Sequence, residues 1–581
     1  MKSTSQQKWI SWMHLAGTST MLAFATVMLS VVITTQSAHA QTFTTLHYFD
    51  ATDGGVPVAP LVQGSDGNFY GTTPAGGANS GCPTSCGTVF KITPRGTLTT
   101  LHNFCSQTNC TDGYQSVAPL IQFSNGAFYG TTEAGGAYTP PFGYGTVFKI
   151  TASGTLTTLD SFGVVSGWNP HDGLAEGTNG DFYGTTYGLG GNGGTVFKIT
   201  SSGALTTLYN FCSQTKCTDG GYPNAGMVLA TNGDFYGTTG DGGDFANGTV
   251  FKITPSGTLT TLHSFDITDG AGPLGLVQAS NGNFYGTTLS GGNNDAGTVF
   301  QITPSGTLTT LYNFCSQSNS ESNCTDGTQA FGTLIQATDG NLYGTTAYGG
   351  NVANMGTIFK ITTSGALTTV YSFCPVTNCT DGGFPMAGLV QGTNGTFYGD
   401  TSAGRISDCP DYGCGTVFSL SVGLGPFVQL QATSGKEGAA IGILGQGFSS
   451  SSVVKFGGTQ ATTITRTGAT FIKATVPAAA LTGSVTVTTG ATTLTSSQTF
   501  RVTPTIVSFS PPSGPVGTPV TITGTGLIQA TKVTFNGKSA SFTATSDTQI
   551  STAVPTGATT GRIMVTTPGG SAASTTSFTV N

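Results

Sequence analysis

The chain has 581 residues, of which 7% are charged, 37% are hydrophobic and 88 are glycine. This length exceeds what one hydrophobic core organises, so several domains or a repeat architecture are expected. The net charge of −7 and the scattered single lysines and arginines exclude nucleic acid and acidic membrane surfaces as expected partners. After residue 40 no long segment has the apolar spacing of a helix, so the sequence predicts an all-β protein.

Residues 1–40 predict a secretory signal peptide. Two lysines precede an apolar stretch over about residues 15–32, and Ala38-His39-Ala40 places small residues for cleavage before Gln41. An uncleaved membrane anchor is the alternative, but glycine, serine and threonine at 17–20 interrupt the stretch. No later run is long enough to span a membrane. We therefore expect an exported protein, located in the periplasm, on the cell surface or outside the cell.

The 12 cysteines form six close pairs with none left over. The pairs are Cys82 and Cys86, Cys105 and Cys110, Cys212 and Cys217, Cys315 and Cys324, Cys374 and Cys379, and Cys409 and Cys414. Zinc is the alternative reading, but the spacers of three, four or eight residues lack accompanying histidines and a recurring ligand spacing. Six local disulfides are therefore predicted, in agreement with export.

Three short tracts each occur seven times between residues 41 and 425. In their first copies, Thr-Thr-Leu begins at Thr44, Phe-Tyr-Gly-Thr-Thr at Phe69 and Gly-Thr-Val-Phe at Gly87. Each period reads as four strands, with Asn-Gly or Asp-Gly in the tight turn between the first two. The chain starts with a fourth-strand tract over 42–49 and the repeat stops after a third-strand tract over 415–420. The orphan strand would complete the last unit, so a closed seven-bladed β-propeller is predicted.

The recurring tracts Asn-Phe-Tyr-Gly-Thr-Thr, Gly-Thr-Val-Phe-Lys-Ile-Thr and Gly-Thr-Leu-Thr-Thr-Leu resemble the Gloeo-Verruco (GloVer) repeat family of exported bacterial proteins. The resemblance covers residues 41–425 and implies bacterial export and a repeat scaffold. It supplies no catalytic residues that map onto this chain.

A different repeat, with a period near 79, occupies the C-terminal part. Ser-Pro-Pro-Ser-Gly-Pro-Val-Gly-Thr, within residues 504–526, resembles the opening of the IPT/TIG family. That resemblance implies an immunoglobulin-like β-sandwich over 503–581. The copy over 426–502 lacks this opening but shares the later positions, so a second sandwich is expected there. Such modules usually act as spacers or contacts.

No catalytic, cofactor-binding or metal-binding residue is predicted, and no cofactor is expected. His47, His102 and His263 share a repeat position that other copies fill with aspartate or tyrosine, which favours a solvated face. The recurrent tyrosine of each Phe-Tyr-Gly tract is interpreted as packing between blades. A recurrent Asp-Gly pair either forms a ring of cation-binding carboxylates or, as favoured here, caps its own loop. Its aspartates are Asp53, Asp112, Asp172, Asp219, Asp269, Asp326 and Asp381.

One connection departs from the repeat. Between residues 162 and 174 it lacks cysteines and reads Gly-Val-Val-Ser-Gly-Trp-Asn-Pro-His-Asp. Trp168 and His171 are candidate ligand contacts, and the alternative is that Trp168 folds back to fill its loop. The variable connections should lie on one face of the propeller.

The leading functional hypothesis is an exported binding module for an extracellular glycan or protein. An extracellular polymer hydrolase or lyase and a structural envelope component are the alternatives.

Overall fold

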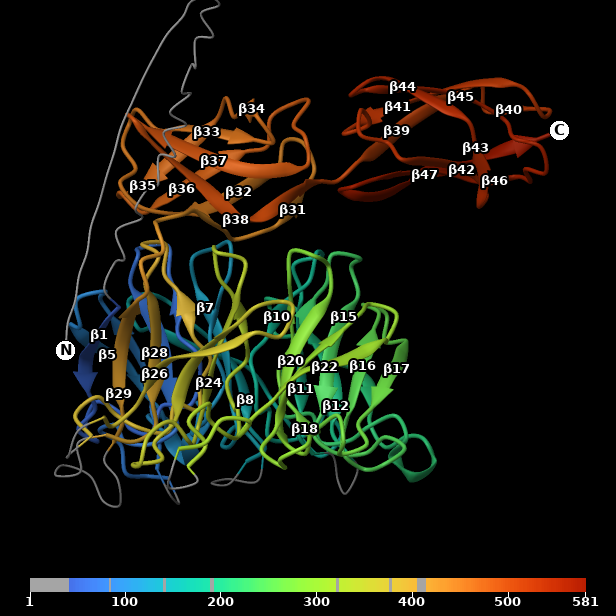
Figure 1. Ribbon diagram of the computed structural model, residues 1–581. Coiled ribbons are helices and arrows are strands. Elements are labelled where there is room, and N and C mark those ends of the chain that lie inside the picture. The colour runs from blue at the N-terminus through green and yellow to red at the C-terminus, as the bar shows by residue number, and fades with distance from the viewer. Residues whose placement is uncertain are drawn as a thin grey trace, which may run out of the picture. The chain divides into compact units, whose positions relative to one another are not determined.

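The computed structural model describes residues 41–581, except 83–84, 139–142, 189–192, 320–322, 376–378 and 405–413 (Figure 1). The predicted signal peptide and Cys409 lie outside the described residues. The described chain is built from strands, with two short 3₁₀ turns, Thr108–Cys110 and Thr215–Cys217. No helix in this part of the chain is long and apolar enough to cross a membrane.

The repeat region forms seven antiparallel sheets. The first three contain β2 (Val62–Gln63), β3 (Phe69–Thr73), β4 (Thr88–Ile92) and β5 (Leu98–Asn103); β6 (Ile121–Gln122), β7 (Phe128–Thr132), β8 (Thr146–Ile150) and β9 (Leu156–Ser161); and β10 (Ala175–Glu176), β11 (Phe182–Thr186), β12 (Thr195–Ile199) and β13 (Leu205–Asn210). The fourth and fifth contain β14 (Val228–Leu229), β15 (Phe235–Thr239), β16 (Thr249–Ile253) and β17 (Leu259–Ser264); and β18 (Ala271–Pro273), β19 (Val277–Gln278), β20 (Phe284–Ser290), β21 (Thr298–Ile302) and β22 (Leu308–Asn313). The sixth and seventh contain β23 (Ile335–Gln336), β24 (Leu342–Thr346), β25 (Thr357–Ile361) and β26 (Leu367–Ser372); and β27 (Val390–Gln391), β28 (Phe397–Thr401), β29 (Thr416–Ser421) and β1 (Thr42–Tyr48).

The first strand of the described chain completes the last sheet. β1 pairs antiparallel with β29, with Thr45 opposite Phe418, as the orphan tract predicts. Without β1, the backbone of β29 would form an open sheet edge.

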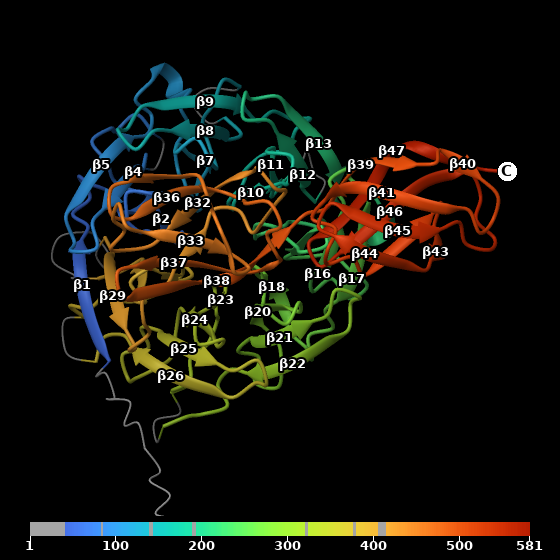
Figure 2. The same cartoon turned by 90° about the horizontal axis from the view of Figure 1, so that it is seen from above.

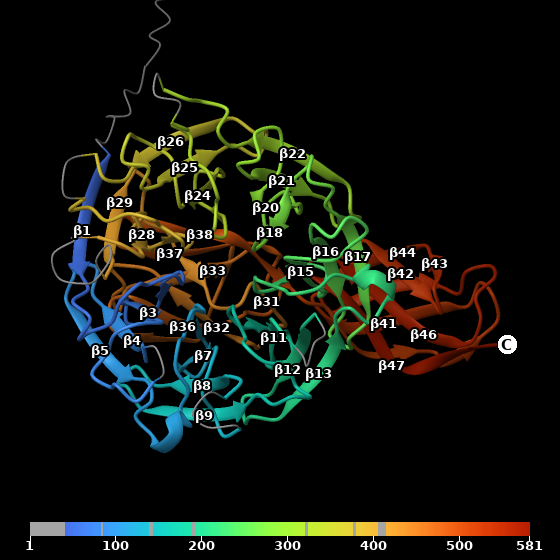
Figure 3. The same cartoon turned by 90° about the horizontal axis from the view of Figure 1, so that it is seen from below.

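Apolar clusters join each sheet to the next. One combines Tyr70 of the first sheet with Phe128 of the second, and the last combines Tyr398 of the seventh with Phe69 of the first. Seven such clusters, one per junction, return the series to its starting sheet. Figures 2 and 3 show the sheets following one another in chain order round a ring.

The recurrent tyrosines lie in these junctions, which confirms the packing interpretation. Each is at most 2% exposed. The Tyr70 ring stacks on Phe128 at 4.0 Å, and Tyr398 stacks on Phe69 at 4.0 Å. The glycine that follows is required by close approach, because a Cβ at Gly130 would lie 2.7 Å from both Phe148 and Leu120.

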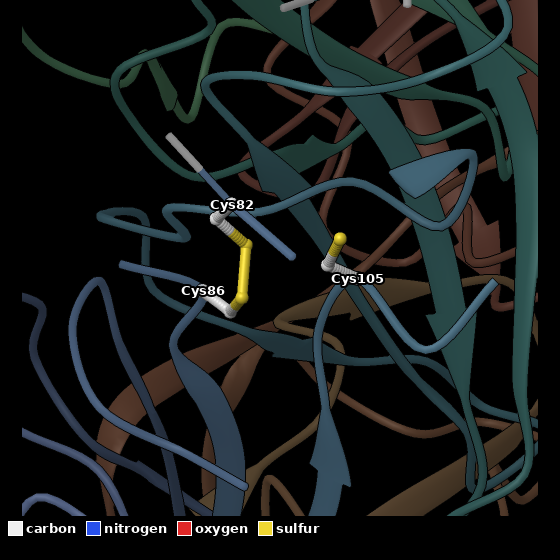
Figure 4. A group of neighbouring side chains, drawn as sticks. All are labelled: Cys82, Cys86 and Cys105. Atoms are coloured by element: carbon white, nitrogen blue, oxygen red, sulfur yellow. A yellow bond between two sulfur atoms is a disulfide. The ribbon is translucent and has the colours of Figure 1, made fainter. Parts of the chain in front are cut away.

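Five of the predicted cysteine pairs are disulfides in the structure: Cys82–Cys86, Cys105–Cys110, Cys212–Cys217, Cys315–Cys324 and Cys374–Cys379. Cys414 is also disulfide-bonded, but the predicted partner Cys409 lies outside the described residues. Disulfides of neighbouring connections pack together, since the sulfurs of Cys82, Cys86 and Cys105 lie within 4.8 Å of one another (Figure 4). These two connections, β3–β4 and β5–β6, therefore lie side by side, as expected for one face carrying the variable loops.

Each C-terminal module is a two-sheet sandwich with the same strand order. The first contains β30 (Gln429–Leu430), β31 (Ser434–Gly435), β32 (Ala440–Leu444), β33 (Val453–Phe456), β34 (Thr459–Gln460), β35 (Ile464–Thr467), β36 (Phe471–Thr475), β37 (Gly483–Thr489) and β38 (Thr492–Val502). The second contains β39 (Thr505–Ser510), β40 (Ser513–Gly514), β41 (Pro519–Thr525), β42 (Lys532–Phe535), β43 (Lys538–Ala540), β44 (Phe542–Ser546), β45 (Gln549–Ala553), β46 (Gly561–Thr567) and β47 (Gly570–Val580). The sheet order β30-β32-β36-β35 recurs as β39-β41-β45-β44, and each module has its own apolar core.

Candidate functional site

Residues from all seven sheets line one cavity of about 610 Å³, named here the central cavity. Most of them come from the segments just before the first strand of each sheet, while Glu133 follows β7. Most of the lining residues are glycine or have apolar side chains, such as Val58, Val117, Leu274, Phe331 and Met386. Such a concave, mostly apolar site with a few polar groups is the usual form of a small-ligand pocket.

The second and third sheets supply the charged part of the central cavity, Glu133 following β7 and His171 and Asp172 preceding β10. Glu133, His171 and Asp172 all line it, and His171 Nδ1 lies 2.9 Å from Glu133 Oε1. The ring of His171 also contacts Tyr187, with ring centroids 4.9 Å apart. No lysine or arginine is among the lining residues that the structure describes. The polar groups thus gather on one side, opposite apolar side chains.

Asp172 is fixed by main-chain donors. The N–H of Gly173 donates to Oδ1 at 2.5 Å, and the N–H of Gly226, from the next sheet, donates to Oδ2 at 2.5 Å. Desolvation raises the pKa of this carboxyl, while both N–H bonds and the nearby His171 act in the opposite direction. The equivalents of Gly226 in the first two copies, two residues before the first strand, are Pro60 and Pro119, which have no N–H to donate.

The position of Asp172 corrects the assignment made from the Asp-Gly pattern. In five copies the aspartate of that pair lies nine residues before the first strand, and Asp269 lies eight before β19. In the third copy that place belongs to Ser166, and Trp168 pairs with Gly188 as Tyr114 pairs with Ala134. Asp172 instead lies three residues before β10, where other copies have mainly alanine. The prediction that Asp172 caps its loop like the other six was wrong, because the third connection has Ser166-Gly167 at the capping register and its one Asp-Gly pair lies six residues later.

The other six aspartates cap their loops. Asp112 accepts from the N–H of Ser106 at 2.9 Å and of Gln107 at 3.2 Å, and from His102 Nε2 at 3.0 Å. The same bond to the fourth strand recurs in the other five copies. The pairs are His47–Asp53, Tyr209–Asp219, His263–Asp269, Tyr312–Asp326 and Tyr371–Asp381.

This network also corrects the interpretation of the histidines. His47, His102 and His263 are bound to loop aspartates, with 22%, 14% and 23% of the side chain exposed, and are not a free solvated face. Tyrosine replaces histidine there because its hydroxyl reaches the same carboxylate. The third copy has Asp160 at this position and Ser166 in place of the loop aspartate, and each bonds locally: Asp160 Oδ1 accepts from the N–H of Ser161, and Ser166 Oγ accepts from the N–H of Gly163.

The structure separates the two candidate ligand contacts. His171 lines the central cavity, whereas Trp168 is not among the lining residues. The half-buried indole of Trp168 covers Gly188, where a Cβ would meet it at 1.6 Å, and stacks on Tyr144 with centroids 5.7 Å apart. This placement matches the alternative in which the tryptophan fills its own loop.

Glu133 was missed in the sequence analysis. It follows the Phe-Tyr-Gly-Thr-Thr tract of the second copy, and it is the only acidic residue at that position among the seven copies. A search for charged residues at otherwise uncharged repeat positions would have found it together with Asp172.

Glu176 of β10 takes the place of a recurrent glutamine. In the second sheet, Gln122 Oε1 accepts from the N–H of Ser65 at 2.8 Å, and Nε2 donates to the Gly126 carbonyl at 3.1 Å. A glutamate cannot make the second bond unless it is protonated. Burial raises the pKa of Glu176 to about 7.

Asp400 is a fully buried carboxyl outside the central cavity. It is 1% exposed, and neither oxygen has a hydrogen-bond partner among the described residues. Other copies have threonine here, as in Thr345, whose hydroxyl donates to the Ala387 carbonyl of the next sheet at 2.8 Å. Burial raises the pKa of Asp400 well above its usual range.

Potential metal ligands gather in one place in the described part of the chain, at Cys82, Cys86 and Cys105. Cys82 and Cys86 are disulfide-bonded to each other, and Cys105 is bonded to Cys110. Their sulfurs are therefore not thiolates, and this cluster does not fit a metal ion.

Solved structures similar to this chain are distant and varied. A fungal alcohol oxidase in complex with copper has 11% identity and a TM-score of 0.41, over 93% of this chain and 99% of that one. A PQQ-bound aldose sugar dehydrogenase from Streptomyces coelicolor has 13% identity and a TM-score of 0.34, over 52% and 92%. SGBP-B from a xyloglucan utilization locus of Bacteroides uniformis has 21% identity and a TM-score of 0.14, over 26% and 48%. No curated protein matches the chain.

Family models match most of the sequence. The Gloeobacter/Verrucomicrobia repeat matches residues 31–163, 137–324 and 214–418, which together span more than half of the chain. The IPT/TIG domain matches residues 428–502 and 504–580. The chain therefore belongs to the Gloeobacter/Verrucomicrobia repeat family and carries two C-terminal IPT/TIG domains.

Proposed function

We propose that the protein is an exported binding module in which the seven sheets are the blades of a closed propeller and a ligand enters the central cavity. One observation carries the proposal. His171 and Asp172 occupy positions that are valine and alanine in the first two copies, and both line a cavity of about 610 Å³. Polar groups confined to one side of an apolar cavity orient a ligand within it. The disulfides support export, because such bonds persist in oxidising compartments.

The cavity chemistry favours a ligand with a cationic or hydrogen-bond-donating group and an apolar body. Glu133 and Asp172 offer acceptor oxygens, and Phe331 and Met386 offer apolar contacts. An anionic group would meet two carboxylates and no lysine or arginine among the described lining residues. A hydroxyl-rich glycan end or a cationic protein side chain has the required chemistry.

A binding screen on the purified chain tests this function, with glycan and matrix-protein arrays alongside polymer-degradation assays. For any ligand found, Asp172→Ala and His171→Val should each weaken binding about tenfold, because each removes a polar contact in a desolvated site. Val117→Ala, a change in another sheet at the same cavity, is the matched control and should change binding less. Binding that survives both third-sheet changes would contradict the cavity as the site.

Trp168 provides a direct readout, because it is the only tryptophan after residue 40. It lies three residues before His171 but outside the cavity, so we propose that it positions this segment. Trp168 fluorescence should shift when ligand binds, and Trp168→Ala should weaken binding less than Asp172→Ala.

A further inference from the structure

The two sandwiches and the repeat region carry opposite charge. Residues 426–581 contain eight lysines and arginines but only two acids, Glu437 and Asp547. Residues 41–425 contain eight lysines and arginines and 23 acids. In a chain with few charges, this excess of cations on the sandwiches is a property of those modules and favours anionic partners.

The second sandwich has a groove of about 240 Å³ where two of these cations lie. The groove runs over the pairing of β42 with β46, in which Lys532 lies opposite Thr566 and Thr534 opposite Met564. Arg562 lies at the other end, beside Asn536, whose N–H donates to the Arg562 carbonyl at 2.9 Å. Thr534, at 6% exposed, forms the floor, while Met564 is 43% exposed.

Neither cation of the groove is neutralised. Lys532 and Arg562 are both exposed, and no described acid forms an ion pair with either. The only acid of the second sandwich, Asp547, is bonded to the N–H of Gly526 and is not among the groove residues. The groove therefore presents uncompensated positive charge.

The spacing of the cations indicates the size of the ligand. Lys532 is level with Thr566, and Arg562 is four residues away on the same face of β46, a separation of about 13 Å. Two side chains that start this far apart can each hold a different anionic group, so a chain molecule with regularly spaced anionic groups suits the pair.

The residues between the cations favour a polysaccharide. The hydroxyls of Thr534 and Thr566 can hydrogen-bond to sugar hydroxyls, whereas the Asn536 amide nitrogen already donates to Thr559 Oγ1 and the Thr560 carbonyl and leaves only its oxygen as an acceptor. The described groove residues include no aromatic side chain on which a nucleobase would stack. Two cations also give far weaker attraction to nucleic acid than the many phosphate contacts of a dedicated binder.

We propose that the β42–β46 groove of the second sandwich binds an acidic polysaccharide, with Lys532 and Arg562 holding two carboxylate or sulfate groups of the same chain. The site is separate from the central cavity, and the proposal does not depend on what that cavity binds.

Affinity electrophoresis of the full chain tests this site. We expect retardation in gels containing polygalacturonate, a carboxylate polymer, or dextran sulfate, and none in gels containing neutral dextran. The two acidic gels distinguish carboxylate from sulfate as the preferred group, and retardation in either supports the proposal. Raising the salt concentration should weaken binding several-fold, since both contacts are exposed to solvent.

The double variant Lys532→Gln, Arg562→Gln should lose at least about tenfold in affinity for the acidic polymer. The double variant Lys436→Gln, Lys473→Gln removes the same charge from exposed positions of the first sandwich and is the matched control. It should lose less than about twofold, and both variants should unfold at the wild-type temperature. Equal losses in the two variants, no retardation of the wild-type chain, or equally strong retardation by single-stranded DNA would each overturn the proposal.

Discussion

The connections that lead into the second and third sheets occupy equivalent places in the repeat but are stabilised differently. Between Cys105 and Leu120 the chain is closed by a disulfide and capped by the buried Asp112. Between Gly163 and Leu174 there is no cysteine, Ser166 replaces the capping aspartate, and His171 and Asp172 line the central cavity. The comparison distinguishes residues that stabilise a connection from residues that place polar groups in the central cavity.

The capping role predicts the largest effect. Asp112→Ala should lower the free energy of unfolding by about 3 kcal/mol, because it leaves two main-chain N–H groups and His102 without their acceptor. Ser166→Ala should cost about 1 kcal/mol or less, since Ser166 Oγ accepts one main-chain bond, from Gly163. Denaturant unfolding of both variants measures the difference. Equal losses would show that the two connections are capped alike.

Asp400 replaces the recurrent threonine but does not line the central cavity, so we expect it only to lower the stability of the fold. Asp400→Thr restores the hydroxyl of the other copies and should raise the free energy of unfolding by about 1–2 kcal/mol at neutral pH. Asp400→Asn is the isosteric comparison and should stabilise less, because it leaves a buried amide to satisfy. Destabilisation by threonine would mean that Asp400 has a partner that the threonine lacks.

Glu176 gives a smaller effect that depends on pH. Its folded pKa of about 7 lies above the ordinary 4.5, so the folded state holds its proton more tightly than the unfolded chain. Stability from this group is present below pH 4.5 and is lost as pH rises to about 7. Glu176→Gln removes that loss, so it should raise the melting temperature more at pH 8 than at pH 5. A shift independent of pH would contradict the assignment.

Asp172 should have the smallest effect on stability. Asp172→Ala gives the residue found in most other copies. The change loses two hydrogen bonds, which is destabilising, but also removes a desolvated carboxyl, which is stabilising. Because the two effects oppose each other, the free energy of unfolding should change by less than about 1 kcal/mol. Thermal unfolding checks this, and ligand binding should weaken about tenfold in the same variant. A loss above about 2 kcal/mol would make Asp172 a structural residue.

The sequence predicts the repeat fold well because the same local pattern occurs seven times. The tyrosine packing, the pairing of β1 with β29 and five disulfides follow from tracts whose spacing leaves little freedom. Local turn residues and alternating apolar positions are strong signals when each copy repeats them.

The candidate site was harder to predict because its residues differ from those at the same positions in the other repeat copies. Asp172 was assigned to the wrong register, since the one Asp-Gly pair of the third connection lies six residues after the Ser-Gly that occupies the repeat position. Glu133 and His171 are 38 residues apart in sequence, and only the fold brings Oε1 and Nδ1 to 2.9 Å. Hydrogen bonds between the fourth strand and the loop aspartate, such as His102 to Asp112, recur in six copies, but the repeat pattern alone does not show that the two positions lie within hydrogen-bond distance.

The pairing of β1 with β29 has a consequence for the order of synthesis. Thr42 leaves the ribosome about 380 residues before its partner Ser421, a delay of roughly 20–75 s at ordinary elongation rates. For that interval β1 is a strand without its neighbour, open to pairing with another chain. The other six sheets can form before β1 finds its partner, and the final docking joins contacts of very high sequence separation, which are slow to form.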